Sequence, residues 1–115
     1  LVKALCVNEL PTPAEPLLRE VALQAGLFGP DTIGLTLGYC IFIVKGHGDT
    51  RLVSHELRHV QQYEMLGGIE KFMSVYLAQI ANLGYYHAPL EKDAREHEII
   101  SVCQRQDTWR RSPFR

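Results

Sequence analysis

The chain has 115 residues, of which 46% are hydrophobic and 22% charged, and its formal net charge is −1. This size suits one domain with a modest core, so we expect residues 1–115 to form a single domain. The near-zero net charge argues against nucleic acid and a charged membrane surface as partners, and the longest apolar run, Tyr39–Val44, is too short to span a bilayer.

An irregular lead-in and a short helix are expected near the N-terminus. Residues Leu10–Pro16 carry three prolines, and the last of them fits the first turn of a helix, where the missing N–H group loses no hydrogen bond. Apolar residues then recur at helical spacing as far as Ala25, and Gly26 provides a stop. Residues 27–30 are predicted to form a turn.

A strand pair is expected next in the chain. Residues Thr32–Val44 are rich in Ile, Leu, Thr, Tyr, Phe and Val, which favour strands. Gly34 and Gly38 mark a bulge or a break, so the segment predicts one strand or two. Residues Lys45–Thr50 contain two glycines and predict a loop.

The second half of the chain predicts three helices. Their approximate bounds are Arg51–Leu66, Ile69–Leu83 and Leu90–Gln106. Asp49 or Thr50 is expected to cap the first helix, glycines follow the first two, and Pro89 opens the third. The basic segment 107–115 is expected to be a loose tail. The predicted class is therefore α+β, mainly helical, with a short β-hairpin or strand pair before the first of these helices.

The segment from His55 to His59 spells HExxH. Residues four apart lie on one face of a helix, so the two imidazoles can bind one Zn²⁺ from the same side. Glu56 then points near the metal and can take a proton from a water that the metal holds. The alternative is a chance match, in which two surface histidines accompany an exposed glutamate.

Catalytic zinc usually has three protein ligands and one open position, so two histidines require a third ligand. Residue type alone leaves six candidates: His87, Glu91, Asp93, Glu96, His97 and Glu98. They all lie in the segment that follows the second predicted helix.

The order of these motifs resembles the gluzincin class of zinc metallopeptidases, and in particular small single-domain gluzincin-like proteins of bacteria. The resemblance covers residues from about Thr32 to Glu98. It rests on the run His-Glu-Leu-Arg-His-Val-Gln-Gln-Tyr from His55 to Tyr63, one intervening helix, and Glu-Lys-Asp-Ala from Glu91 to Ala94.

That resemblance implies a set of roles. His55, His59 and Glu91 would bind Zn²⁺, and Glu56 would be the general base. The segment Thr36–Val44, just before the HExxH helix, would flank a cleft where an extended peptide can add to the edge of a strand.

The chain departs from the family pattern at Arg95, where gluzincins have an aspartate four residues after the ligand glutamate. That aspartate commonly orients a ligand histidine. Asp93 or a backbone carbonyl is expected to take its place beside His55 or His59.

The segment Tyr85-Tyr86-His87 precedes the presumed ligand Glu91. One of these three side chains is expected to donate a hydrogen bond to the oxyanion of a tetrahedral intermediate. His87 is the better candidate, with an extra metal ligand as its alternative, and the tyrosines have simple packing as theirs. His47 and His97 are expected to be surface histidines.

The resemblance thus implies a zinc-dependent metallopeptidase, a hydrolase that cleaves a peptide or protein substrate. Two alternatives stay open: a zinc-binding domain that recognises a peptide or partner without cutting it, and a metal-dependent hydrolase with another substrate. In so small a chain the cleft wall is one or two strands, so a second copy or a partner protein that completes the cleft fits this prediction.

Three cysteines, Cys6, Cys40 and Cys103, are scattered and form no CxxC pair. This pattern suggests reduced thiols in a reducing compartment. No signal-peptide pattern is visible, so a cytoplasmic location is expected. The chain begins at Leu1 rather than Met, which leaves a missing N-terminal segment as an alternative.

Overall fold

The computed structural model describes residues 1–12, 14–17, 19–20 and 32–99. In chain order its elements are β1 Lys3–Val7, β2 Gly34–Leu37, β3 Cys40–Val44, α2 Thr50–Leu66, α3 Ile69–Leu83 and α4 Pro89–Glu96. The predicted α+β class, with strands before three helices, is confirmed. Most of the helix predicted up to Ala25, the turn at 27–30 and the tail 107–115 lie outside the described residues. None of the described helices combines the length and the apolar character that crossing a bilayer requires.

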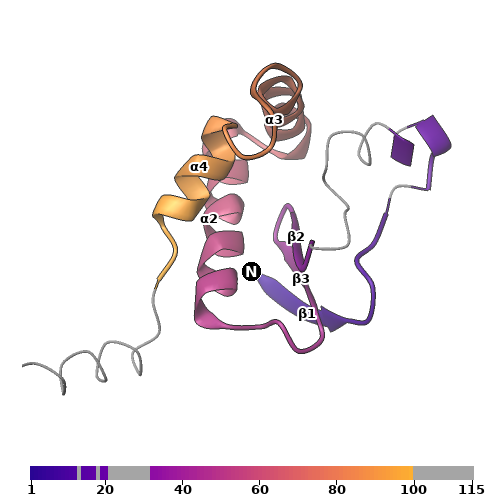
Figure 1. The fold of residues 1–115 in the computed structure, drawn as a ribbon, viewed down its shortest axis with the longest axis vertical. Coiled ribbons are helices and arrows are strands. Elements are labelled where there is room, and N and C mark those ends of the chain that lie inside the picture. The colour runs from indigo at the N-terminus through magenta and orange to yellow at the C-terminus, as the bar shows by residue number, and fades with distance from the viewer. Residues whose placement is uncertain (13, 18, 21–31, 100–115) are drawn as a thin grey trace, which may run out of the picture.

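The three strands form one sheet in the order β1-β3-β2 (Figure 1). Strands β2 and β3 are an antiparallel hairpin, with Leu37 opposite Cys40. Gly38, at a φ of 60°, begins the two-residue turn between them, a conformation that glycine adopts without steric cost. Of the two predicted alternatives, the hairpin is therefore the one that forms.

Strand β1 was not predicted, so the expected order of one helix followed by strands and helices is wrong at its start. Lys3–Val7 pairs parallel to β3, with Leu5 opposite Phe42. Among the described strands β3 is thus central, and only β2 offers an edge beside α2. The Thr36–Val44 segment, expected to flank a cleft, therefore offers a strand edge only where it overlaps β2, because the backbone of β3 is paired on both sides.

One face of the hairpin packs on α2. The side chains of Ile41 and Ile43 are 1% and 4% exposed and form a cluster with Val60 of α2, against which Leu52 and Val53 also pack. Alternate residues of a strand point to the same face, so burial of 41 and 43 fixes which side of β3 meets the helix. Figure 1 shows α2 with the sheet on one side and α4 on the other.

The bounds of α2 follow from its caps, as predicted. The side chain of Asp49 accepts a hydrogen bond of 2.8 Å from the N–H of Leu52. At the other end Gly67 takes a left-handed conformation with a φ of 93°, and its N–H donates to the carbonyl of Tyr63. Because both ends are fixed, the helical phase of the HExxH segment is fixed too.

A second core cluster holds α3 against α2. The rings of Tyr63 and Phe72 stack with centroids 3.9 Å apart, and Phe72 stacks on Tyr76 at 5.1 Å. Ile80 of α3 and Ala88, just before α4, complete the buried set. The aromatic column therefore fixes the position of Tyr76 relative to α2.

Helix α4 is shorter than predicted. It ends at Glu96 rather than near Gln106, and residues 97–99 are not helical. Nδ1 of His97 lies 2.8 Å from the carbonyl of Asp93, where it caps the last turn. Ile99 then donates its N–H to Oγ of Ser54 on α2, at 2.8 Å. The cap at His97 and the contact of Ile99 with α2 replace continued helix. Residues 100–106 lie outside the described residues.

Candidate metal centre

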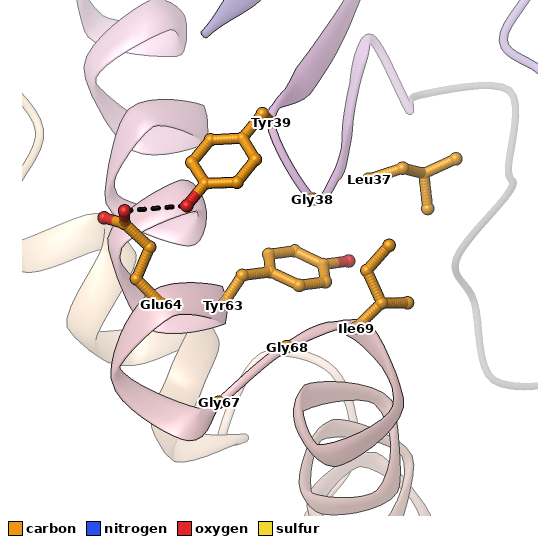
Figure 2. A pocket seen from close by; sticks show the side chains of 8 residues that line it. All are labelled: Leu37, Gly38, Tyr39, Tyr63, Glu64, Gly67, Gly68 and Ile69. Carbon is orange, nitrogen blue, oxygen red and sulfur yellow. Dashed lines mark hydrogen bonds between the residues drawn. The ribbon is translucent and has the colours of Figure 1, made fainter. Parts of the chain in front are cut away.

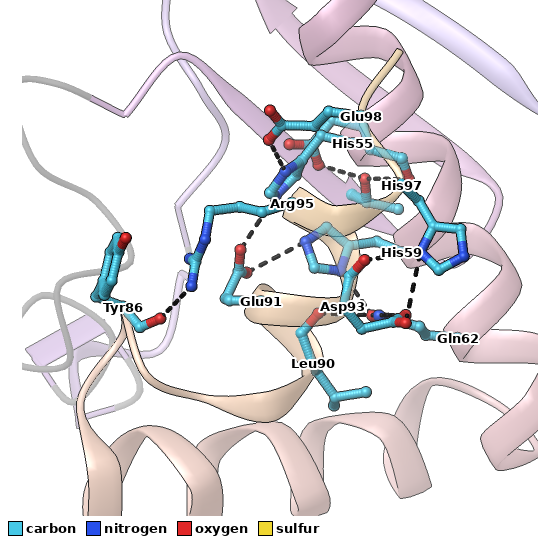
Figure 3. Close-up of polar contacts among 12 residues, drawn as sticks. His55, His59, Gln62, Tyr86, Leu90, Glu91, Asp93, Arg95, His97 and Glu98 are labelled. Atoms are coloured by element: carbon cyan, nitrogen blue, oxygen red, sulfur yellow. Dashed lines mark hydrogen bonds and ion pairs between the residues drawn. The ribbon is translucent and has the colours of Figure 1, made fainter.

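Two histidines of α2 and one glutamate of α4 converge on one point (Figure 3). Nε2 of His55 lies 3.1 Å from Oε1 of Glu91, and Nε2 of His59 lies 3.1 Å from Oε2 of the same carboxylate. Tetrahedral zinc with bonds of about 2.0–2.1 Å would hold its ligand atoms about 3.3 Å apart. Both nitrogen–oxygen distances are close to that value, and one ligand atom from each of the three side chains lies within 4.8 Å of the other two.

The site is buried, which contradicts a chance pair of surface histidines. The exposed fractions are 6% for His59, 2% for Glu91 and 5% for Glu56. Charged groups are seldom buried unless they are paired or coordinate a metal. Because these three side chains are buried together, they are expected to be paired with one another or to coordinate a metal.

The outer nitrogen of each imidazole also faces an acceptor. Nδ1 of His55 lies 2.7 Å from the carboxylate of Glu98, which in turn lies 3.6 Å from Arg51. Nδ1 of His59 lies 2.8 Å from Oε1 of Gln62. The acceptors are thus Glu98 and Gln62, and the expectation of Asp93 or a backbone carbonyl in this place is wrong.

This arrangement requires positive charge between the rings and Glu91. If Nδ1 of His55 donates to Glu98, Nε2 of a neutral ring would turn its lone pair toward the Glu91 carboxylate. Burial lowers the pKa values of His55 and His59, but the hydrogen bonds and charges of Glu91 outweigh it and raise both. Two ring protons, or one divalent cation with neutral rings, would satisfy the site. The donor set therefore fits a metal ion.

Glu91 is held from a third side by α3. The hydroxyl of Tyr76 donates a hydrogen bond of 2.6 Å to Oε2 of Glu91. Burial raises the pKa of Glu91, yet the hydrogen bonds and charges of His55 and His59, together with Tyr76, lower it well below the usual range. The carboxylate is therefore ionised, as a metal ligand must be.

Glu56 lies beside this centre and is held by the hairpin. The hydroxyl of Thr36 on β2 lies 2.5 Å from Oε1 of Glu56. A Cβ on Gly34 would stand 3.1 Å from Oε2, so the strand backbone passes very close to the carboxylate. Burial raises the pKa of Glu56, against the opposing charges of His59 and His55 and the hydrogen bond from Thr36. A carboxylate with a raised pKa is suited to accept a proton.

In the loop before α4, the hydroxyl of Tyr85 responds to the charges of the centre. Tyr85 is 42% exposed, yet burial of its hydroxyl and the charges of Glu91 and Glu56 raise the pKa of that hydroxyl. The side chain of His87 is exposed, and its ring meets that of Tyr86 edge-on at 5.2 Å. The role expected for His87 stays a prediction.

Arg95, the departure from the family pattern, contacts this loop. Its guanidinium donates to the backbone carbonyl of Tyr86 and stands 4.1 Å from the centroid of the Tyr86 ring. The residue therefore ties the loop to α4 and orients no ligand histidine.

Among the described residues, none of the other candidate ligands joins the cluster of His55, His59 and Glu91. Glu96 and His87 are exposed, and the His97 ring is bound to Asp93. Asp93 itself pairs with Arg58 at 2.7 Å. Glu98 is close, but it meets the outer nitrogen of His55 and not the side that faces Glu91.

A hollow of about 530 Å³ lies between the β2–β3 turn and the junction of α2 and α3 (Figure 2). Tyr39, Tyr63 and Glu64 stand in its wall, with the Tyr39 hydroxyl bound to Glu64 at 2.8 Å. Tyr63 also donates a hydrogen bond of 2.9 Å to the carbonyl of Thr36. Tyr63 thus lines the hollow and also contacts Thr36, the residue that holds Glu56.

The sequence did not predict a role for three residues that hold side chains of the centre in place. Gln62 had a usable signal, because it follows His59 by three residues on the same helical face. Thr36 and Tyr76 had none, since their contacts join segments 20 and 15 residues apart in the chain.

No protein-family model, curated protein or solved structure matches this chain.

Proposed function

We propose that the protein is a zinc-dependent metallopeptidase of the gluzincin type. Zinc would be held by His55, His59 and Glu91, and Glu56 would act as the general base on a peptide or protein substrate. The observation that carries this proposal is the approach of both Nε2 atoms to the two oxygens of Glu91, 3.1 Å in each case.

The donor set favours zinc among the common divalent ions. Two imidazole nitrogens and one carboxylate oxygen suit Zn²⁺, whereas calcium and magnesium prefer oxygen ligands alone. When bound, zinc supplies a Lewis acid that polarises the scissile carbonyl and makes water a nucleophile at neutral pH. Three protein ligands leave the fourth position for the reaction.

Glu56 would move the proton. Thr36 binds Oε1, which would hold the carboxylate in one orientation while it accepts a proton from the attacking water. Its raised pKa allows it to hold that proton and then deliver it to the leaving amine. No covalent intermediate with the chain is needed, because water is the nucleophile.

The loop of residues 85–87 would supply the hydrogen bond to the oxyanion. Tyr85 is the donor that we favour, since burial and the charge of Glu91 raise the pKa of its hydroxyl and so keep its proton in place. His87, proposed on sequence grounds, remains the competing donor. Arg95 would position this loop through Tyr86.

The test compares the zinc-loaded wild type with Glu56→Gln on an unfolded substrate such as casein. Gln keeps the shape but cannot take a proton, so hydrolysis should fall by about 10²–10⁴-fold while zinc stays bound. Glu64→Gln, at the other end of the same helix, is the matched control and should retain hydrolysis.

Two outcomes would contradict this function. Full hydrolysis by Glu56→Gln would remove Glu56 as the base. A wild type that binds zinc but cleaves no peptide would favour the alternative, a zinc-binding domain that recognises a peptide or partner without cutting it.

A further inference from the structure

A partly buried chain of hydrogen bonds runs from Arg58 through Asp93 and Gln62 to His59. Figure 3 shows Asp93, Gln62 and His59. Nε of Arg58 donates to Oδ2 of Asp93 at 2.7 Å. Nε2 of Gln62 donates to the same oxygen at 2.8 Å and to the carbonyl of Leu90 at 2.9 Å. Oε1 of Gln62 meets Nδ1 of His59 at 2.8 Å. We call this chain of hydrogen bonds, from Arg58 through Asp93 and Gln62 to His59, the relay. Gln62, in its middle, is 1% exposed.

The relay fixes which way the Gln62 amide points. Both partners of its nitrogen, the Asp93 carboxylate and the Leu90 carbonyl, are acceptors only. A flipped amide would turn its oxygen toward those two oxygens and leave a buried repulsion in place of two hydrogen bonds. The amide oxygen must therefore face His59.

The orientation of the amide in turn fixes the proton of His59. An amide oxygen can only accept, so Nδ1 of His59 must be the donor. In a neutral ring the lone pair is then on Nε2, the nitrogen that lies 3.1 Å from Glu91. This is the tautomer that a metal ion at the centre requires.

We propose that Gln62 is a positioning residue that holds His59 in its metal-binding tautomer, and that Asp93 and the Leu90 carbonyl hold Gln62 in turn. This inference deepens the proposed zinc site and rests on it. Gln62 lies on the ligand helix itself, three residues from His59, whereas the partner of His55 comes from beyond α4.

The same relay joins two of the three ligands. Asp93 lies two residues after Glu91 on α4 and binds both Arg58 and Gln62 of α2. The contacts of Asp93 with α2 therefore position Glu91 on α4 and, through Gln62, also orient the ring of His59. The arrangement prepares the site before an ion arrives.

Zinc affinity, measured by competition with a chromophoric chelator, tests this role. Gln62→Met keeps a similar length but removes the amide, and should bind zinc about 10- to 100-fold more weakly than the wild type. Gln61→Met is the matched control, because Gln61 is exposed and contacts Arg58 at 2.8 Å but not His59. Its zinc affinity should equal that of the wild type. Circular dichroism would establish that each variant is folded.

A spectroscopic measurement separates tautomer control from simple packing. In the zinc-loaded wild type, long-range ¹H–¹⁵N spectra should show a protected proton on Nδ1 of His59 and zinc on Nε2. In zinc-saturated Gln62→Met that proton should exchange rapidly. The wild-type spectrum tests the relay even if the variant does not fold.

Equal zinc affinity of Gln62→Met and wild type, or zinc on Nδ1 of His59, would overturn the relay and leave the proposed function standing. A wild type that binds no zinc would overturn both.

Discussion

The hydroxyl of Thr36 and the carboxylate of Glu56 lie 2.5 Å apart, so the edge strand of the sheet holds the proposed base of the HExxH helix. The same hydroxyl lies 3.2 Å from the backbone carbonyl of Glu56. Strand β2 thus does more than border the centre, because it fixes the orientation of the one acidic side chain that is proposed to move a proton.

Replacing Thr36 with Val should lower turnover and leave zinc affinity unchanged. Val keeps the branched shape but cannot donate, so Glu56 loses one hydrogen bond. A hydrogen bond to a charged group contributes about 1.5–3 kcal/mol, which corresponds to a loss of about 10- to 100-fold in rate if it all acts on orientation. Steady-state kinetics with a fluorogenic peptide would measure this, and Leu35→Val in the same strand is the control. Wild-type kcat in Thr36→Val would show that Glu56 needs no support from β2.

The loop before α4 gives a prediction that distinguishes two donors. Tyr85→Phe should lower kcat by about 10²-fold, the lower end of the usual effect of losing an oxyanion donor, while zinc affinity stays the same. His87→Ala should have a small effect, because the His87 side chain is exposed and its ring lies against Tyr86. The reverse pattern in kcat would assign the role to His87.

Removal of metal should destabilise the fold. Zinc at 100 times its dissociation constant would add about 2.7 kcal/mol to the free energy of unfolding, by mass action. A strong chelator should therefore lower the melting temperature of the wild type. His59→Ala, which lacks a ligand, should melt at the same temperature with and without the chelator. A chelator effect of equal size in both proteins would mean that the stabilising metal sits elsewhere.

The aromatic column behind the centre gives a stability prediction. Phe72 is 3% exposed and stacks between Tyr63 and Tyr76, with the ring of His59 edge-on at 6.1 Å. Phe72→Ala should cost about 3–5 kcal/mol in the free energy of unfolding. Urea denaturation would measure it, with Val75→Ala on the exposed side of α3 as control. Similar losses in the two variants would show that the column is not part of the core.

Much of the helical half could be predicted because local signals determine it. Asp49 and Gly67 mark the ends of α2, and Gly84 and Pro89 mark the break between α3 and α4. The ligand set could be narrowed to Glu91 only through the resemblance, since six side chains had suitable chemistry.

The missed features depend on contacts distant in sequence. Strand β1 is short and largely exposed, so its residues carry no pattern that reveals a parallel partner 37 positions away, such as Cys40 for Lys3. The helix predicted over Leu90–Gln106 was too long, because a helical sequence pattern continues past Glu96. In the structure, the contacts of Glu98 with His55 and of Ile99 with Ser54 direct the chain across α2 instead. Only the folded arrangement brings those pairs together.

Zinc X-ray absorption of the full chain, loaded with one equivalent of zinc, tests the central claim most directly. We predict about one bound zinc per chain, with only nitrogen and oxygen neighbours at about 2.0–2.2 Å and the scattering signature of two imidazoles. Sulfur neighbours at about 2.3 Å, which would implicate the cysteines, or a chain that retains no zinc, would contradict a centre built from His55, His59 and Glu91.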